Sequence, residues 1–174
     1  MSVDSVVGQG STFSIDVPIS EDRAEPRLSN QGMLKLPVDK FSNINVLCLD
    51  NDSSVLEAMQ VLIEGWGCTI TPVLTYKEGL AAFSKQNYQI VLADYRLDYA
   101  ETGLDFLRTV KEVTDARSMA PVQAILITAE QDESIEERAL EMGFYYMQKP
   151  IEPSALKSLM LFLVSDIEQQ QIAQ

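Results

Sequence analysis

Short apolar runs alternate with amphipathic segments over most of this chain, and that alternation limits the folds open to it. Apolar, β-prone runs predict strands at 44–49, 68–74, 88–94, 122–127 and 144–147. Helical periodicity predicts helices near 53–64, 75–86, 104–113, 134–142 and from Pro153 onward. Strands that alternate with helices form a parallel sheet covered on both faces. The sequence therefore predicts an α/β domain with a doubly wound, five-stranded parallel sheet in the order 2-1-3-4-5.

Local signals support several of these boundaries. An apolar stripe marks the first helix, and Gly65 and Gly67 close it; the stripe consists of Val55, Leu56, Met59, Leu62 and Ile63. The segment from Thr75 to Glu78 has the form of a capping box. Pro153 suits a first helical turn, where its missing N–H has no partner in any case.

Four polar residues stand where predicted strands end: Asp50, Asp94, Thr128 and Lys149. A lone Asp after a strand would more often cap the following turn. In the order 2-1-3-4-5, however, the first and third strands are neighbours, so Asp50 and Asp94 face one crevice at the carboxyl edge of the sheet. We expect Thr128 and Lys149 to line its other wall.

This constellation predicts phosphoryl-transfer chemistry. Two carboxylates at one point favour a hard divalent cation, and we expect Mg²⁺. The cation would let an anionic phosphoryl group approach Asp94, the expected nucleophile, and an acyl phosphate would result. Lys149 would neutralise a phosphoryl oxygen, and Thr128 would donate a hydrogen bond.

Composition excludes several other functions. A formal charge of −13 argues against a nucleic-acid partner and against direct contact with an anionic membrane. The chain has no histidine, so any phosphohistidine chemistry needs another polypeptide. Cys48 and Cys68 lie in predicted strands without CxxC spacing, which is typical of core residues in a reduced, cytoplasmic protein. The N-terminus lacks the features of a signal peptide.

The N-terminal part differs from the rest. In residues 1–19, a glycine-rich segment precedes the alternation of Phe13, Ile15 and Val17, which predicts one strand without a partner in this chain. Residues 20–42 are polar and interrupted by proline, as expected of a linker. The compact domain is expected at 43–170.

Residues 43–165 resemble the receiver domain of two-component response regulators, which has a flavodoxin-like fold. The resemblance rests on the acids at Asp50-Asn51, on Asp94, on Thr128 in the segment Ile127-Thr128-Ala129-Glu130, and on the pair Lys149-Pro150. It implies that Asp94 accepts a phosphoryl group and that the peptide bond before Pro150 is cis.

The same resemblance implies a ligand set, a switch and partners. Mg²⁺ would be held by Asp50, Asn51, Asp94 and the backbone carbonyl of Arg96. Thr128 and Tyr146 would couple phosphorylation to the face built from 134–142, 144–147 and the last helix. A histidine kinase or a histidine phosphotransfer domain would supply the phosphoryl group, and that face offers a possible homodimer contact. One position departs from the family pattern, because Asn51 stands where a second acid is usual.

The N-terminal piece resembles the end of a different family. Residues 5–18 are similar to the glycine-rich box and last strand that close the ATP-binding domain of sensor histidine kinases. The combination implies the C-terminal end of a hybrid sensor histidine kinase, a transferase whose remainder could be anchored in a membrane. This chain keeps too little of that domain to be a kinase by itself.

Two alternative functions remain open at this point. The segment Asp50-Asn51-Asp52 also resembles the DxD motif of haloacid-dehalogenase-type phosphatases, with Asp50 as the nucleophile and Asp52 as the acid. That family needs a further acidic pair after the lysine, which is poorly provided here. The second alternative is a degenerate receiver that serves only as a docking module, and Asn51 is the residue that suggests it.

Overall fold

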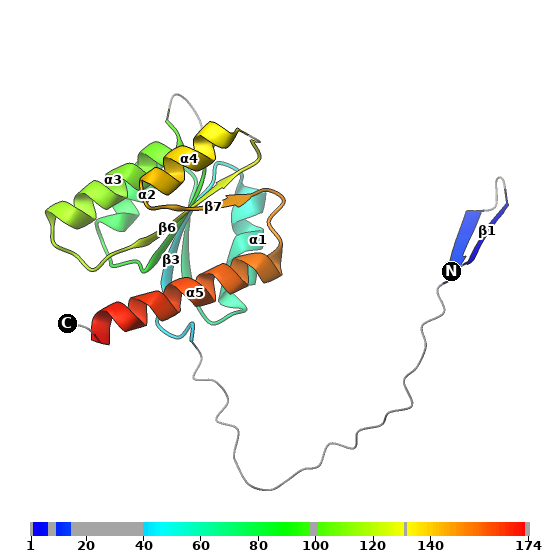
Figure 1. Cartoon of the computed structure of the whole chain (residues 1–174), viewed down its shortest axis with the longest axis horizontal. Coiled ribbons are helices and arrows are strands. Elements are labelled where there is room, and N and C mark those ends of the chain that lie inside the picture. The colour runs from blue at the N-terminus through cyan, green and yellow to red at the C-terminus, as the bar shows by residue number, and fades with distance from the viewer. Residues whose placement is uncertain (1, 7–9, 15–39, 98–100, 131, 173–174) are drawn as a thin grey trace, which may run out of the picture. The chain divides into compact units, whose positions relative to one another are not determined.

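A computed structural model describes residues 2–6, 10–14, 40–97, 101–130 and 132–172 (Figure 1). The chain divides into two compact units, Met1–Lys35 and Leu36–Gln174, and each is described by itself.

The larger unit is built on a five-stranded sheet. Its strands are β3 (Asn45–Leu49), β4 (Thr69–Val73), β5 (Ile90–Asp94), β6 (Gln123–Thr128) and β7 (Tyr145–Gln148). All neighbours are parallel, in the order β4-β3-β5-β6-β7. This is the predicted order 2-1-3-4-5, so the predicted fold class is confirmed.

Helices cover both faces of the sheet (Figure 1). Helices α1 (Ser53–Glu64) and α5 (Pro153–Ile172) pack on one face, and α2 (Tyr76–Phe83), α3 (Gly103–Ala116) and α4 (Glu133–Glu141) pack on the other. Alternate residues of β3 show why the strands read as continuous apolar runs. Val46 and Cys48 point into the α1/α5 core, whereas Leu47 and Leu49 point into the opposite core.

Helices α1 to α4 each begin at a residue whose side chain caps the helix. Asp52, Thr75, Thr102 and Asp132 each accept a hydrogen bond from a backbone N–H in the first turn. The predicted capping box forms only in part, because the Glu78 carboxylate accepts from the amide of Leu74 rather than from that of Thr75. Helix α2 also ends at Phe83, before the predicted 86, because Ser84 already forms its C-cap.

The core of the larger unit extends upstream of the predicted start at residue 43. Phe41 is buried, and its ring stacks on Trp66 with 6.2 Å between the ring centroids. Lys40 donates a hydrogen bond to the hydroxyl of Ser165 on α5. The predicted linker therefore contributes its last residues to the folded unit, and its residues 20–39 lie outside the described residues.

One prediction for the N-terminal unit is wrong. The predicted strand has a partner within this chain, because β2 (Gly10–Ser14) pairs antiparallel with β1 (Ser2–Val6). Its residues Gly10 to Thr12 lie in the strand rather than in a turn, and Ile15 and Val17 lie outside the described residues. A short connection is enough to join antiparallel strands, so the partner was available immediately upstream. Among the residues that the structure describes, no helix is long and apolar enough to cross a bilayer.

The central strand β5 should be the least tolerant of truncation. Leu92 is fully buried in it, so Leu92→Ala should lower the free energy of unfolding by about 2–5 kcal/mol through lost burial and a new cavity. Val61 on α1 is 76% exposed, and Val61→Ala should change that free energy by no more than about 0.5 kcal/mol. Urea unfolding of both variants measures the difference, and equal effects would contradict the assignment of β5 to the core.

Candidate functional site

The two predicted acids lie side by side at the carboxyl edge of the sheet. Asp94 is the last residue of β5, and Asp50 directly follows β3, its neighbour. The strands pair in register, with Leu49 opposite Ala93, so the chain delivers both acids to the same level. Both are buried, with Asp50 4% and Asp94 7% exposed. The two acids are therefore neighbours at this edge, as the strand order predicted.

Lys149 joins these acids. It follows β7 in the loop that leads to α5, and its Nζ lies 2.9 Å from Asp50 Oδ2 and 2.9 Å from Asp94 Oδ1. The peptide bond that follows it, Lys149-Pro150, is cis, as the resemblance implied. One ammonium group thus bridges two buried carboxylates that would otherwise repel one another.

Burial and charge shift the proton affinities of this cluster. Burial raises the pKa of Asp94 above its ordinary value, and the neighbouring Asp50 adds to that rise, while the hydrogen bond and charge of Lys149 oppose it. Burial works against the charge of Lys149, but its hydrogen bonds and ion pairs with Asp94 and Asp50 outweigh burial and raise the pKa of Lys149. Lys149 therefore keeps its proton more tightly than an ordinary lysine, and the Asp94 carboxyl gives up its proton less readily than an ordinary aspartate.

The two residues after Asp50 have different surroundings. Asp52 caps α1, where its Oδ1 accepts from the amide and the hydroxyl of Ser54. These hydrogen bonds lower the pKa of Asp52. Its backbone N–H donates to Asp50 Oδ1 at 2.9 Å, so Asp52 supports the first acid while its own carboxylate is engaged at the helix start. Asn51 is exposed beside them.

Gly103 is a site residue that the sequence analysis passed over. A Cβ at this position would lie 2.0 Å from the carbonyl oxygen of Asp94, so only glycine allows the start of α3 to approach β5 this closely. Its N–H donates to the carbonyl of Tyr95, and Thr102 forms a bridge with Arg96. The contact of Gly103 with Asp94 has no local signal in the sequence, because it depends on how the start of α3 packs against β5.

The predicted switch residues meet through a third residue, Glu130. The hydroxyl of Thr128, which is 1% exposed, accepts from the Glu130 amide at 3.0 Å. The Tyr146 hydroxyl donates to the Glu130 carbonyl at 3.2 Å. The Glu130 carboxylate forms an ion pair with Arg96 from the loop after β5. Sequence reasoning had included Glu130 only as the end of a motif, because nothing local shows that three partners converge on it.

The donors present fit a hard dication. Two buried carboxylates already share one cation, the Lys149 ammonium, and the amide oxygen of Asn51 and the backbone carbonyl of Arg96 belong to neighbouring segments. Among the described residues, no three His, Cys, Asp or Glu side chains gather in a group suited to a metal ion. Such a group is not required where neutral oxygens and water complete the coordination of Mg²⁺.

Two curated bacterial regulators are similar in sequence to part of this chain. The DNA-binding transcriptional regulator NtrC of Salmonella typhimurium is 29% identical over 127 residues, which are 72% of this chain and 26% of that protein. The transcriptional regulatory protein ZraR of Escherichia coli is 29% identical over 111 residues, 63% of this chain and 24% of that protein. The chain therefore spans about a quarter of the length of these curated relatives.

Solved structures share the fold. A CheY-like receiver domain protein from Methanospirillum hungatei superimposes with a TM-score of 0.66 at 21% identity, covering 74% of this chain and 99% of that one. The chemotaxis protein CheY4 of Vibrio cholerae gives 0.63 at 17% identity, covering 70% and 99%. Residues 46–160 match the family described as the response regulator receiver domain. This chain belongs to the response regulator receiver domain family.

Proposed function

We propose that Asp94 accepts a phosphoryl group from a phosphohistidine of a partner protein, and that the product alters the face formed by α4, β7 and α5. The observation that carries this proposal is the Lys149 ammonium at 2.9 Å from both Asp50 and Asp94. A bridging cation between two buried acids stabilises a site in which one acid can become a nucleophile for an anionic group.

The residues divide the work of the transfer. An Asp94 oxygen attacks phosphorus, the bond from phosphorus to the partner's imidazole nitrogen breaks, and the imidazole leaves with that electron pair. The Lys149 ammonium neutralises an oxygen of the transferring group. The Thr128 hydroxyl accepts from the Glu130 amide, so its own hydrogen is available to donate to another of these oxygens.

Mg²⁺ is part of the proposal. Its ligands would be the carboxylates of Asp50 and Asp94, the amide oxygen of Asn51 and the backbone carbonyl of Arg96. When bound, the cation would offset the negative charge that the phosphoryl group brings to two carboxylates. With the cation present, Asp50 and Asp94 would no longer depend on Lys149 alone for charge compensation, so the Lys149 ammonium could pair with the phosphoryl oxygens.

An apolar groove beside the pocket suits the expected partner. It is lined by α1 and by the loop after β7, with Val55, Met59, Leu62 and Ile151 as apolar members and Lys149 as the charged one. A helix bearing the phosphohistidine could lay an apolar face in this groove and present its imidazole to Asp94. We therefore infer a histidine kinase or a histidine phosphotransfer domain as the donor. Its phosphoryl group comes from ATP, which supports a cytoplasmic location.

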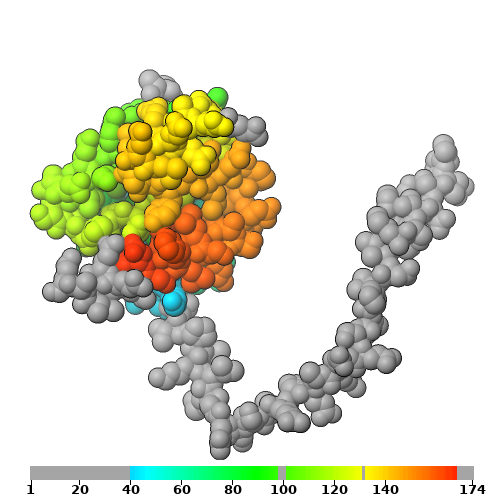
Figure 2. Space-filling view, in the orientation of Figure 1, coloured from blue at the N-terminus to red at the C-terminus, as the bar shows by residue number. Residues whose placement is uncertain are grey.

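The two helices of the proposed output face are exposed on the surface. In Figure 2, α4 in yellow and α5 in orange and red lie on the visible side of the larger unit. Leu140 and Phe162 are 55% and 59% exposed on these helices, and the Phe162 ring packs edge-on against Tyr145. Exposed apolar side chains next to an edge strand support a homodimer contact on this face.

The parent protein is a separate proposal. The similarity of residues 5–18 to the end of a kinase ATP-binding domain supports a hybrid sensor histidine kinase as the whole protein, and we propose that its remainder is anchored in a membrane. The chain itself contains no histidine that could be phosphorylated.

Phosphorylation should occur at Asp94 and nowhere else. With Mg²⁺ and acetyl phosphate, the chain should gain one phosphoryl group, and Asp94→Asn should abolish the gain because the amide is not a nucleophile. The exposed Asp115→Asn serves as a control that should label normally. Intact-mass spectrometry with peptide mapping decides the outcome: label on Asp50 would favour the phosphatase alternative, and no label a docking module.

Restoring the acid at position 51 should strengthen metal binding. Asn51→Asp adds one negative charge to the ligand set, so we expect Mg²⁺ affinity to rise by at least about threefold. Asp52→Ala should leave that affinity nearly unchanged, because the Asp52 carboxylate already caps α1. Calorimetric titration of both variants is the measurement. Loss of binding in Asp52→Ala alone would contradict this ligand set.

Removing Lys149 should make stability depend more strongly on pH. A carboxyl with a raised pKa binds its proton more tightly in the folded state, so it costs stability above the pKa of the unfolded chain and recovers it as pH falls. Lys149→Met leaves Asp50 and Asp94 uncompensated, and should cost about 1–3 kcal/mol near neutral pH and less at about pH 5. Urea unfolding at both pH values tests this, with the exposed Lys77→Met as control. A deficit in Lys149→Met that does not change with pH would contradict it.

A further inference from the structure

Helix α4 has little apolar packing to hold it in place. Only Ile135 and Ala139 of its residues are buried, while Leu140 is 55% exposed. A helix with so small a buried stripe is positioned largely by the contacts at its two ends. Those ends are connected to different parts of the domain.

The N-terminal end follows the proposed phosphorylation pocket. Glu130 lies just upstream of the N-cap Asp132, and it is hydrogen-bonded to both Thr128 and Tyr146. A change at the Thr128 hydroxyl therefore acts on the Glu130 amide, in the segment that leads into α4. Because the switch would act on α4 through its N-terminal end, the C-terminal end needs no connection to the pocket.

The C-terminal end is closed by a Schellman motif, and the carbonyl of its C-cap residue accepts from a donor outside the helix. Gly143 has a φ of 79°, its N–H donates to Leu140, and the N–H of Phe144 donates to Ala139. The carbonyl of the C-cap residue Met142 accepts from Lys111 Nζ of α3 at 3.0 Å. A lysine at this point also complements the negative end of the helix dipole.

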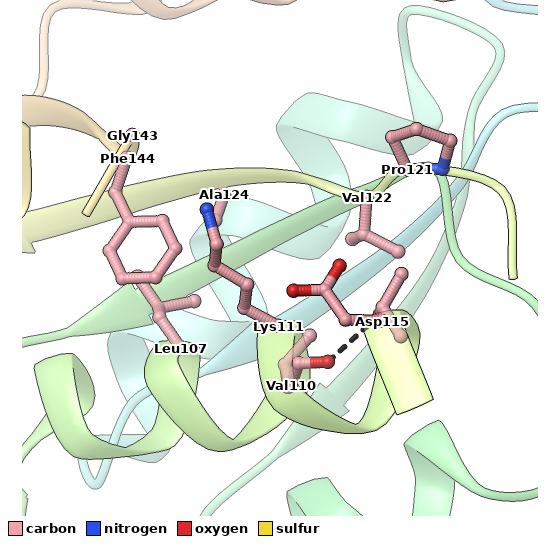
Figure 3. Close-up of a pocket in the computed structure, with 10 residues that line it drawn as sticks. Leu107, Val110, Lys111, Asp115, Pro121, Val122, Ala124, Gly143 and Phe144 are labelled. Atoms are coloured by element: carbon pink, nitrogen blue, oxygen red, sulfur yellow. Dashed lines mark hydrogen bonds between the residues drawn. The ribbon is translucent and has the colours of Figure 1, made fainter. Parts of the chain in front are cut away.

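Figure 3 shows how Lys111 reaches this turn. Its side chain runs from α3 toward Gly143 and Phe144, and Nζ lies 5.9 Å from the centroid of the Phe144 ring. A cavity of about 110 Å³ adjoins it, between α3 and the segments at Pro121 and Gly143. Part of the gap between α3 and the turn is therefore unfilled, and Lys111 bridges it with a hydrogen bond and a cation–π contact.

We propose that Lys111 is a positioning residue whose hydrogen bond to the Met142 carbonyl holds the C-terminal end of α4 against α3; we call this contact the pin. When the domain switches, the N-terminal end of α4 moves while the C-terminal end stays in place; we call this movement the swing. The swing rests on the proposed function, since phosphorylation is what would displace the Thr128–Glu130–Tyr146 contacts. The pin itself does not, because it consists of the hydrogen bond from Lys111 Nζ to the Met142 carbonyl, which involves no residue of the pocket.

The pin is tested first in the chain without ligand. Lys111→Met keeps the aliphatic stem but removes the donor, so amide hydrogen exchange at Gly143 and Phe144 should become at least about threefold faster. Lys111→Arg, which still donates, should stay near wild type, as should the exposed neighbour Glu112→Gln. Unchanged exchange at Gly143 and Phe144 in Lys111→Met, with the fold intact, would overturn the pin.

The swing is tested with Mg²⁺ and beryllofluoride, a mimic of the phosphoryl group. In wild type, amide chemical shifts should change over 132–136 and little over 141–144; in Lys111→Met the changes should extend through 144. Equal changes at both ends of α4 in wild type would overturn the swing. If neither protein responds to beryllofluoride, the proposed function fails, while the exchange measurement without ligand still decides the pin.

Discussion

Two buried carboxylates at adjacent strand ends are the constraint on which the functional end of this domain depends. Asp50 and Asp94 repel one another where water cannot screen them, and the Lys149 ammonium, 2.9 Å from each, makes the arrangement tolerable. The lysine comes from the far edge of the sheet, after β7. The pocket therefore forms only when the whole sheet, including β7, has assembled.

The residues around this cluster fix the backbone next to Asp50 and Asp94 without removing the carboxylates from the reaction. Asp52 supports Asp50 through its N–H but uses its own carboxylate to cap α1. Gly103 lets α3 begin against the carbonyl of Asp94. Glu130 then connects the pocket to Tyr146 and to the start of α4. The pocket is firmly supported on the side of α1 and α3, whereas α4 is lightly packed. A domain with this combination can convert a change of charge in the pocket into a movement of a surface helix.

Much of the fold was accessible from sequence because its signals are local. Each strand is a short apolar run, the stripe of α1 has helical period, and N-cap residues such as Thr75 act within one turn. The errors also have local causes. Ser84 ended α2 earlier than its periodicity suggested, and the partner of β2 lay immediately upstream, in a segment whose alternation is weak.

By itself, the sequence determined the alternation of strands and helices, and hence the sheet order, the shared edge of Asp50 and Asp94, and the family resemblance. Only the tertiary structure showed that one lysine reaches both acids, that Glu130 joins Thr128 to Tyr146, and that Lys111 holds the turn after α4. The reason is physical: periodicity and capping act between near neighbours, whereas these contacts join residues far apart in the chain, whose distances are set by how helices pack across the sheet.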